Sequence, residues 1–168
     1  MLMSLKKSSQ KVEAFLQIHN IPAEIMEFQE TTKTSHDAAK QIGCKLGQIA
    51  KSLIFQKQNT NELILIVASG KNMVDTQKVE KIINDKIKRA DPTFIKQETG
   101  FVIGGVPPFA HNKKLETILD KDLENYEEIW AAAGTPNSVF RLTPIKLQQL
   151  TKAKFQDIKK LTQSLVNS

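Results

Sequence analysis

The amino-acid sequence predicts one α+β or mixed α/β domain. Its 168 residues suit a single domain that is long enough to bury a core. Apolar periodicity gives about seven strands and five helices in mixed order, with hairpins, rather than the regular alternation of a βαβ series. A hydrophobic content of 40% and a charged content of 25% are typical of a soluble globular protein. No internal repeat or linker divides the chain, so we expect the domain to span residues 1–168.

Each helix is expected from the spacing of its apolar side chains and from the residues that bound it. A helix begins behind a Ser, Thr or Asp cap and ends at glycine or before proline. Thr34, followed three residues later by Asp37, forms a capping box of this kind. The expected helices, in order, are residues 8–19, 34–42, 75–84 and 91–100, with a fifth that opens at residues 143–144.

Strands are expected where short apolar runs lie between turn signals. Residues 59–61 are a hairpin signal, and the run from Leu63 to Ala68 returns from it without polar alternation, which indicates burial on both faces. The expected strands, in order, are residues 23–28, 52–55, 63–68, 86–89, 115–119, 128–133 and 139–142.

Residues 100–111 are the stretch around which we expect the molecule to be organised. Residues 101–103 are predicted to form a strand that breaks at Gly104-Gly105, where the backbone is free to adopt unusual angles or to approach another chain segment closely. Pro107 and Pro108 then fix φ and remove two backbone donors. The result is a stiff loop, and the residue types leave two interpretations open: the wall of a pocket, or a rigid turn between two strands.

Lys51 is the most suggestive charged residue. It opens an apolar strand directly after a turn that contains glycine, where the floor of a pocket would meet its rim. A partly desolvated lysine at such a place can donate to a phosphate or to a developing oxyanion. The alternative is a lysine whose stem covers an edge strand while its charge stays in water.

Asp120, His111 and Cys44 are further candidates, and each has a structural alternative. Asp120 ends a strand, a usual place for a functional carboxylate, but it can equally cap the next turn with Asp122. His111 has the intrinsic pKa of an acid or base, although single histidines are usually structural. Cys44 is interpreted as a small hydrophobic residue at a helix end, because no nucleophile motif or histidine partner accompanies it.

Composition limits the classes of partner and site. The single cysteine excludes an internal disulfide or a multi-cysteine metal site and fits a reducing cytoplasm. No apolar run is long enough for a transmembrane helix, and no glycine-rich phosphate loop supports nucleotide binding. The net charge of +6, from 24 Lys and Arg against 18 Asp and Glu, permits a nucleic-acid partner held through its phosphates. A solvated lysine-rich surface is the simpler account of the charge alone.

Several short stretches stand in an order and at a spacing that point to one known family. They are Thr34-Ser35 with Ala38-Ala39, IAKSL at residues 49–53, VASG at 67–70, Ala90-Asp91-Pro92, GGVPPF at 104–109, Asp120, and WAAAGTP at 130–136. Together they resemble the YbaK and prolyl-tRNA editing domain family, over about residues 10–158.

The resemblance implies a fold, an activity and partners. The fold is a single compact α+β domain, a mixed and mostly antiparallel β-sheet surrounded by helices (YbaK-like). The activity is hydrolysis of the ester between a wrong amino acid and the 3′ end of a tRNA, with no metal and no other cofactor. The implied partner is an aminoacylated tRNA in the cytoplasm, with an aminoacyl-tRNA synthetase as a further expectation and no membrane.

The resemblance also assigns roles to residues. Lys51 matches the family's central lysine, which would hold the terminal phosphate or ribose of the substrate and favour the charged transition state. Gly104 and Pro108 bound the family's Gly-x-x-x-Pro element, whose backbone would position the aminoacyl group and limit its size. These three are the expected catalytic residues. The expected substrate-binding residues are Gly105, His111, Asp120 and Gly134.

The expected substrate is a small amino acid, alanine first and cysteine second, on the proline tRNA or a related tRNA. Ala132 and Val139 stand where members directed at cysteinyl-tRNA carry polar residues, which favours alanine or another small apolar amino acid. Ala110 replaces the glycine expected between Phe109 and His111, a departure that could tilt His111. Two alternatives remain: a catalytically silent module that binds tRNA or a synthetase, and a hydrolase of an unrelated small ester.

Overall fold

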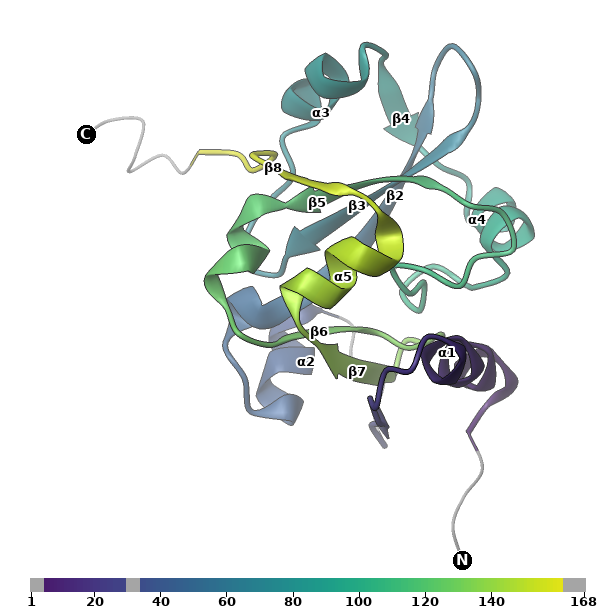
Figure 1. The fold of residues 1–168 in the computed structure, drawn as a ribbon. Coiled ribbons are helices and arrows are strands. Elements are labelled where there is room, and N and C mark those ends of the chain that lie inside the picture. The colour runs from purple at the N-terminus through teal and green to yellow at the C-terminus, as the bar shows by residue number, and fades with distance from the viewer. Residues whose placement is uncertain (1–4, 30–33, 162–168) are drawn as a thin grey trace, which may run out of the picture.

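An eight-stranded mixed sheet runs through the structure, which is a computed structural model describing residues 5–29 and 34–161 (Figure 1). In chain order its strands are β1 (Ile25–Glu27), β2 (Ile49–Lys57), β3 (Leu63–Ser69), β4 (Ile87–Arg89), β5 (Glu116–Asp120), β6 (Ile129–Ala132), β7 (Ser138–Leu142) and β8 (Lys154–Gln156). Their order across the sheet is β1-β7-β6-β2-β3-β5-β8. The remaining strand, β4, pairs with β2 on the edge that β3 leaves free.

The pairing is mixed and mostly antiparallel. The hairpin of β2 and β3, the β6–β7 pair and the two short pairs of β1 with β7 and β4 with β2 are antiparallel. The pairs of β2 with β6, β3 with β5 and β5 with β8 are parallel. The predicted α+β fold class is therefore confirmed, and the short strand β8 adds to the strands that the sequence predicted.

Five α-helices surround the sheet in the part of the chain that the structure describes. They are α1 (Lys7–Ile18), α2 (Ser35–Ile42), α3 (Thr76–Ile83), α4 (Pro92–Thr99) and α5 (Pro144–Thr151), with the short 3₁₀ segments η1 (Leu46–Gln48) and η2 (Lys121–Asn125). Their starts follow the capping rules. For example, Thr34 Oγ1 accepts a hydrogen bond from the N–H of Asp37 at 3.1 Å, and Asp91 caps α4 with proline at the first helical position. Gly43 and Gly100 end α2 and α4 in the left-handed conformation.

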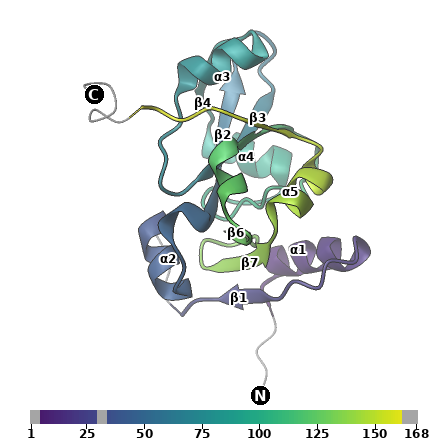
Figure 2. The same ribbon diagram turned by 60° about the vertical axis from the view of Figure 1, so that its left-hand side comes forward.

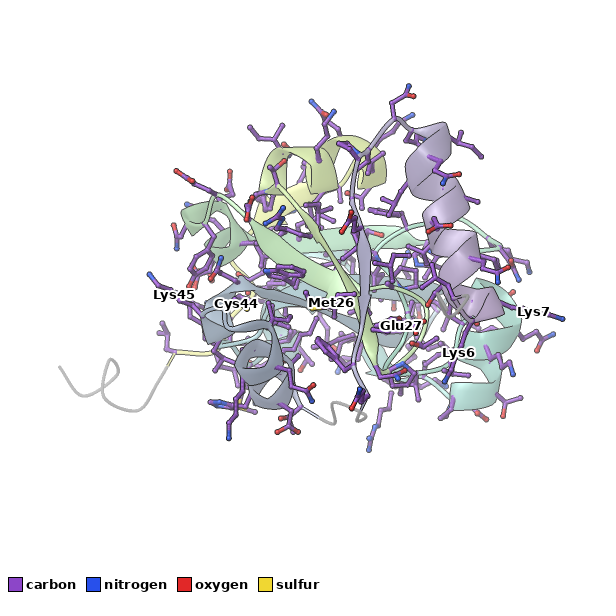
Figure 3. The ribbon with its side chains drawn as sticks, turned by 90° about the horizontal axis from the view of Figure 1, so that it is seen from below. Lys6, Lys7, Met26, Glu27, Cys44 and Lys45 are labelled. Carbon is purple, nitrogen blue, oxygen red and sulfur yellow. The ribbon has the colours of Figure 1, made fainter. Side chains whose placement is uncertain are left out.

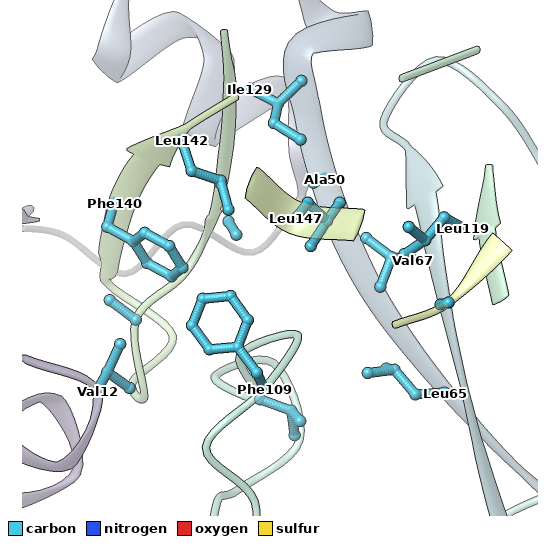
Figure 4. Close-up of a cluster of buried hydrophobic side chains, with 14 of the residues drawn as sticks. Val12, Ala50, Leu65, Val67, Phe109, Leu119, Ile129, Phe140, Leu142 and Leu147 are labelled. Carbon is cyan, nitrogen blue, oxygen red and sulfur yellow. The ribbon is translucent and has the colours of Figure 1, made fainter. Parts of the chain in front are cut away.

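The core lies on both faces of β3, every residue of which is buried. Leu65 and Val67 point to the larger cluster, which α1 and α5 cover and which includes Val12, Phe109, Phe140 and Leu147 (Figure 4). Ile64 and Ile66 point to a smaller cluster that α3 covers through Val79. This two-sided burial is what the uninterrupted apolar run predicted.

Helices α1, α2 and α5 lie on two sides of the molecule. α2 lies on one side and α1 and α5 lie on the other (Figure 2). β1 runs along the outer edge of the sheet between α1 and α2, and Met26 and Glu27 mark its course (Figure 3). Among the described residues, no helix has the length and apolarity that crossing a bilayer requires.

The strand predicted for residues 101–103 is wrong. The chain there turns instead: the N–H of Gly105 donates to the carbonyl oxygen of Val102 at 3.0 Å, and Phe101 N–H is bonded to Thr99 Oγ1. Phe101 is buried, whereas Val102 and Ile103 are 40% and 57% exposed. An apolar run forms a strand only where it pairs with another strand, and here the turn from Val102 to Gly105, with Gly104 at φ +89°, takes the place of such pairing.

Candidate functional site

A hollow of about 290 Å³ lies where the sheet splits between β2 and β6. The start of α2 forms one wall, β2 forms the floor, β6 and β7 form the far wall, and the loop after α4 closes the hollow. Its lining residues are Thr34, Ser35, Ala38, Ile49, Ala50, Lys51, Ser52, Leu53, Ile103, Gly104, Val106, Trp130, Ala132, Pro136, Ser138 and Val139.

The split exposes the backbone of β2 to the hollow. β6 pairs with β2 only at Ile49 and Ala50, and β4 pairs with β2 only from Phe55 onward. Between them, residues 51–54 face no paired strand among the described residues on that edge. In the β2–β3 hairpin, hydrogen-bonded pairs alternate with non-bonded pairs. Gly70 N–H donates to Ile49 at 2.7 Å, so the alternation turns the N–H and C=O of Ser52 away from β3, toward the hollow.

Ser52 also brings an unpaired hydroxyl to this site. Its Oγ is buried and has no hydrogen-bond partner in the described structure. A buried polar atom of this kind is rare in folded proteins and is usually satisfied by water or by a ligand. Ser52 was not among the residues that the sequence analysis selected. The signal that could have found it is its place directly after Lys51 in the strand.

Lys51 lies in the floor of the hollow, half-buried. Burial lowers the pKa of its ammonium group, and the negative charge of Asp120 acts in the opposite direction. No hydrogen bond or ion pair holds the Lys51 ammonium within the described residues. A cation that is partly desolvated and has no partner can bind an anionic or partly negative group of a ligand.

Asp120 lies near Lys51 but outside the hollow, 1% exposed. Its Oδ2 accepts from the backbone N–H of Ser69 at 3.0 Å and from Asn72 Nδ2 at 2.9 Å. Its Oδ1 accepts from the N–H of Asp122 at 3.0 Å, which caps η2. The register places Lys51 opposite Ala68 and Leu119 opposite Val67, so Asp120 and Lys51 project from one face of the sheet on either side of β3. Asp120 therefore acts on Lys51 through space.

Gly104 and Gly105, in the loop after α4, and Gly134, in the turn between β6 and β7, have two different roles. Gly104 lines the hollow with φ +89°, a conformation that other residues rarely adopt. Gly105 and Gly134 instead hold two backbones together: Gly134 N–H donates to the Gly105 carbonyl at 3.0 Å. A Cβ on Gly105 would lie 2.7 Å from Thr135 Cα, so the close approach depends on glycine.

Pro108 and His111 lie outside this hollow and line a different one, next to α1. Nε2 of His111 lies 2.7 Å from the carbonyl oxygen of Pro107, and because a carbonyl only accepts, that nitrogen carries the proton. Burial lowers the pKa of His111, the bond to Pro107 raises it, and the charge of Lys11 lowers it further. The histidine is therefore a neutral group that fixes the loop.

The structure thus brings together Lys51 and Gly104 of the seven predicted site residues. Ala132 and Val139, which were used to predict the substrate, line the same hollow. Cys44 packs beside the apolar cluster of α2, and burial raises the pKa of its thiol. Among the described residues, no three His, Cys, Asp or Glu side chains gather as a metal site would require.

The lining suggests chemistry without a side-chain base. Among the described lining residues there is no histidine, carboxylate or cysteine, and the polar side chains are Lys51, four with hydroxyl groups and the indole of Trp130. Such a site can orient a ligand, stabilise negative charge with one cation and open backbone donors, and admit water.

Comparison with known proteins gives one family. A family model described as the aminoacyl-tRNA editing domain matches residues 29–150. The protein YwhH of Bacillus subtilis (strain 168) is 34% identical over 131 residues, which are 78% of this chain and 83% of that protein. The multifunctional Ser/Thr-tRNA deacylase ProXp-y of Escherichia coli (strain K12) is 30% identical over 103 residues, 58% of this chain and 62% of the deacylase.

Solved structures agree with this result. A crystal structure described as a candidate trans-editing enzyme for prolyl tRNA synthetase has a TM-score of 0.88 and 38% identity, over 94% of this chain and 100% of that one. The hypothetical protein APE2540 has a TM-score of 0.81 at 23% identity, over 89% of this chain and 99% of that one, a likeness of fold.

Proposed function

We infer the function of this chain from its family, because the chain belongs to the aminoacyl-tRNA editing domain family. It is a hydrolase of the aminoacyl-tRNA ester bond, and its fold is that of a trans-editing deacylase. We propose that the editing domain comprises residues 1–168, that it acts in the cytoplasm on free mischarged tRNA, and that the hollow between β2 and β6 is its active site.

The active site is placed here because the ammonium group of Lys51, which has no hydrogen bond or ion pair within the described residues, lies beside the unpaired edge of β2. The ester of an aminoacyl-tRNA lies next to the terminal ribose and phosphate, so a single cation at the floor can hold that end of the substrate. The backbone N–H of Ser52 faces the same space and can donate to the oxygen that becomes negative when water attacks the carbonyl. Gly104 leaves room for the substrate where a side chain would intrude.

Water is the nucleophile in this proposal. The described lining residues include no Cys, His, Asp or Glu, and the Ser and Thr hydroxyls have no lining base to activate them. Rate enhancement then comes from holding the ester and water in place and from stabilising the oxyanion with Lys51 and backbone donors. The water oxygen bonds to the carbonyl carbon, and the bond from that carbon to the ribose oxygen breaks. The proton that the water loses reaches the leaving ribose oxygen through solvent or through the neighbouring hydroxyl of the terminal ribose, so the products are the free amino acid and the tRNA.

The hollow limits the size of the amino acid. Its volume of about 290 Å³ is at the low end for ligand pockets, which suits a small aminoacyl group together with part of the terminal ribose. A synthetase pocket discriminates against a smaller amino acid by only about 1–3 kcal/mol for each methylene. A separate pocket that admits only the smaller, wrong amino acid can then hydrolyse the mischarged tRNA that the synthetase releases. Alanine on the proline tRNA fits the apolar wall of Ala132 and Val139, with cysteine as the second choice.

Serine or threonine is an alternative substrate to these two amino acids, and one observation favours it. The unpaired Oγ of Ser52 would gain a partner from a serine or threonine side chain but not from alanine. The related E. coli protein is a Ser/Thr-tRNA deacylase by name. The pocket would then use its apolar wall for the Cβ region and Ser52 for the hydroxyl.

Deacylation of a tRNA panel tests the function and names the substrate. Proline tRNA charged with alanine, cysteine, serine, threonine or proline is incubated with wild type, Lys51→Ala and the control Lys88→Ala. Lys88 is an exposed lysine of β4, so its loss changes the net charge equally without touching the hollow. We expect rapid hydrolysis of one or two small aminoacyl groups by wild type and the control, and a loss of at least about 100-fold in Lys51→Ala. Hydrolysis by Lys51→Ala at the control's rate would refute the placement of the site.

A further inference from the structure

A second hollow of about 630 Å³ lies on the other side of the central loop, between α1 and the end of α5. Figure 2 shows α1 and α5 on the side of the molecule away from α2. The loop from Pro108 to His111 forms its inner wall. We call this hollow the α1 groove. Its remaining lining residues are Lys11, Ala14, Phe15, Ile18, His19, Lys114, Leu115, Thr117, Leu150, Thr151 and Lys152.

The charge of the α1 groove is positive and unbalanced. Lys11, Lys114 and Lys152 line it, and no described lining residue is an aspartate or glutamate. Lys114 and Lys152 form no side-chain hydrogen bond or ion pair within the described residues, whereas Lys11 donates to Asn112 Oδ1 at 3.0 Å. Lys113, the residue before Lys114, is instead paired with Glu98 at 2.8 Å. Two lysines of the groove therefore keep a charge that no described side chain neutralises.

Stacked aromatic rings form the apolar side of the groove. The ring of Phe15 lies between His19, at 4.1 Å between centroids, and Phe109, at 4.7 Å, with interplanar angles of 26° and 17°. Phe109 is buried and Phe15 half-buried, while His19 is exposed at the mouth. A stack that ends in an exposed planar ring offers a surface on which a nucleobase can continue the stacking.

One loop forms a wall of both hollows. Gly104 and Val106 line the candidate active site, and Pro108 and Phe109 line the α1 groove. Four residues of chain span at most about 14 Å, so the two sites lie close together on one rigid element. The neutral His111, bonded to Pro107, holds this loop in place.

We propose that the α1 groove binds an unpaired nucleotide of the tRNA, with its base stacked on His19 at the exposed end of the aromatic stack and its phosphates held by Lys114 and Lys152. Free cations supply affinity for the phosphates of single-stranded RNA, and stacking on aromatic rings tolerates any base. The inference rests on the proposed function, because it takes the nucleotide to be part of the substrate. It adds a second contact with the RNA that is separate from the ester site.

Affinity for uncharged tRNA tests the groove without requiring catalysis. Dissociation constants are measured at several salt concentrations for wild type, Lys114→Ala/Lys152→Ala and the control Lys81→Ala/Lys88→Ala. The control removes two exposed lysines of α3 and β4 and so matches the charge change. We expect the groove variant to bind roughly tenfold more weakly and its salt slope to fall by about 1.4, or about 0.7 for each phosphate contact in a single strand. The control should differ little from wild type.

A third variant separates stacking from charge. His19→Ala should weaken tRNA binding with an unchanged salt slope, because it removes a ring and no phosphate contact. At subsaturating charged tRNA, single-turnover hydrolysis by the groove variants should fall in proportion to their loss of affinity for tRNA. Equal affinities for the groove variant and its control would overturn the proposal, as would binding of AMP in the groove without any effect of these substitutions on tRNA. If no charged tRNA is hydrolysed, the proposed function fails while the binding result still decides the groove.

Discussion

The substitution Asp120→Asn distinguishes a structural carboxylate from one that touches the substrate. The Asp120 carboxylate accepts three hydrogen bonds, two on Oδ2 and one on Oδ1, and it is 1% exposed. An amide of the same shape has one acceptor oxygen, so its NH₂ group must face at least one of these donors. The N–H of Asp122 or that of Ser69 then loses its partner.

The expected cost follows from these contacts. Losing a hydrogen bond to a charged acceptor costs about 1.5–3 kcal/mol, and an orphaned buried donor adds about 1–3 kcal/mol. Removing the buried charge also removes its desolvation cost, which offsets part of this loss of stability. We expect a net loss of about 3 kcal/mol in the free energy of unfolding, which lowers Tm by on the order of 10 °C for a chain of this length.

Thermal and urea unfolding measure this loss, with Asp157→Asn as the control. Asp157 is 62% exposed and pairs with Lys78 at 3.1 Å, so its substitution should cost no more than about 1 kcal/mol. Well below its Tm, Asp120→Asn should retain kcat/KM within a few-fold at neutral pH. A loss of activity of more than about 100-fold with an unchanged Tm would refute the structural role and place Asp120 on the substrate.

Three further predictions concern the hollow and its walls. Because burial lowers the pKa of Lys51, its charge should be lost at a lower pH than the usual lysine value of 10.5; enzymatic deacylation, corrected for spontaneous hydrolysis, should therefore decline on the alkaline side below that pH. Lys51→Arg should abolish this decline, since arginine stays protonated, and an identical pH profile would contradict the role of Lys51. Ser52→Ala should lower kcat/KM for seryl- and threonyl-tRNA by roughly 10-fold or more while leaving alanyl-tRNA within a few-fold; equal effects on all three would refute selection through the hydroxyl. Gly105→Ala places a Cβ 2.7 Å from Thr135 Cα and should lower the stability by about 1–3 kcal/mol, whereas an unchanged Tm would show that this approach of the two backbones is not needed.

The helix starts and the central hairpin were predictable because their causes are local. Thr34 and Asp91 cap helices through bonds within three residues, and Gly43 and Gly100 end them. The apolar run of β3 specifies burial on both faces wherever the strand lies. The strand expected at residues 101–103 is absent because an apolar run does not by itself specify whether the chain pairs with another strand or turns, as it does from Val102 to Gly105.

For the candidate site, too, some properties follow from the sequence and others only from the tertiary structure. The sequence by itself determined the family, and with it the kind of bond that is hydrolysed, because the order of several short stretches survives in the chain. Only the tertiary structure decided which predicted residues share a space. The split between β2 and β6 leaves the backbone of Ser52 unpaired, and one loop places Gly104 in the lining of one hollow and Pro108 in that of another. Such placements depend on contacts between segments far apart in sequence, and no local pattern of residues encodes them.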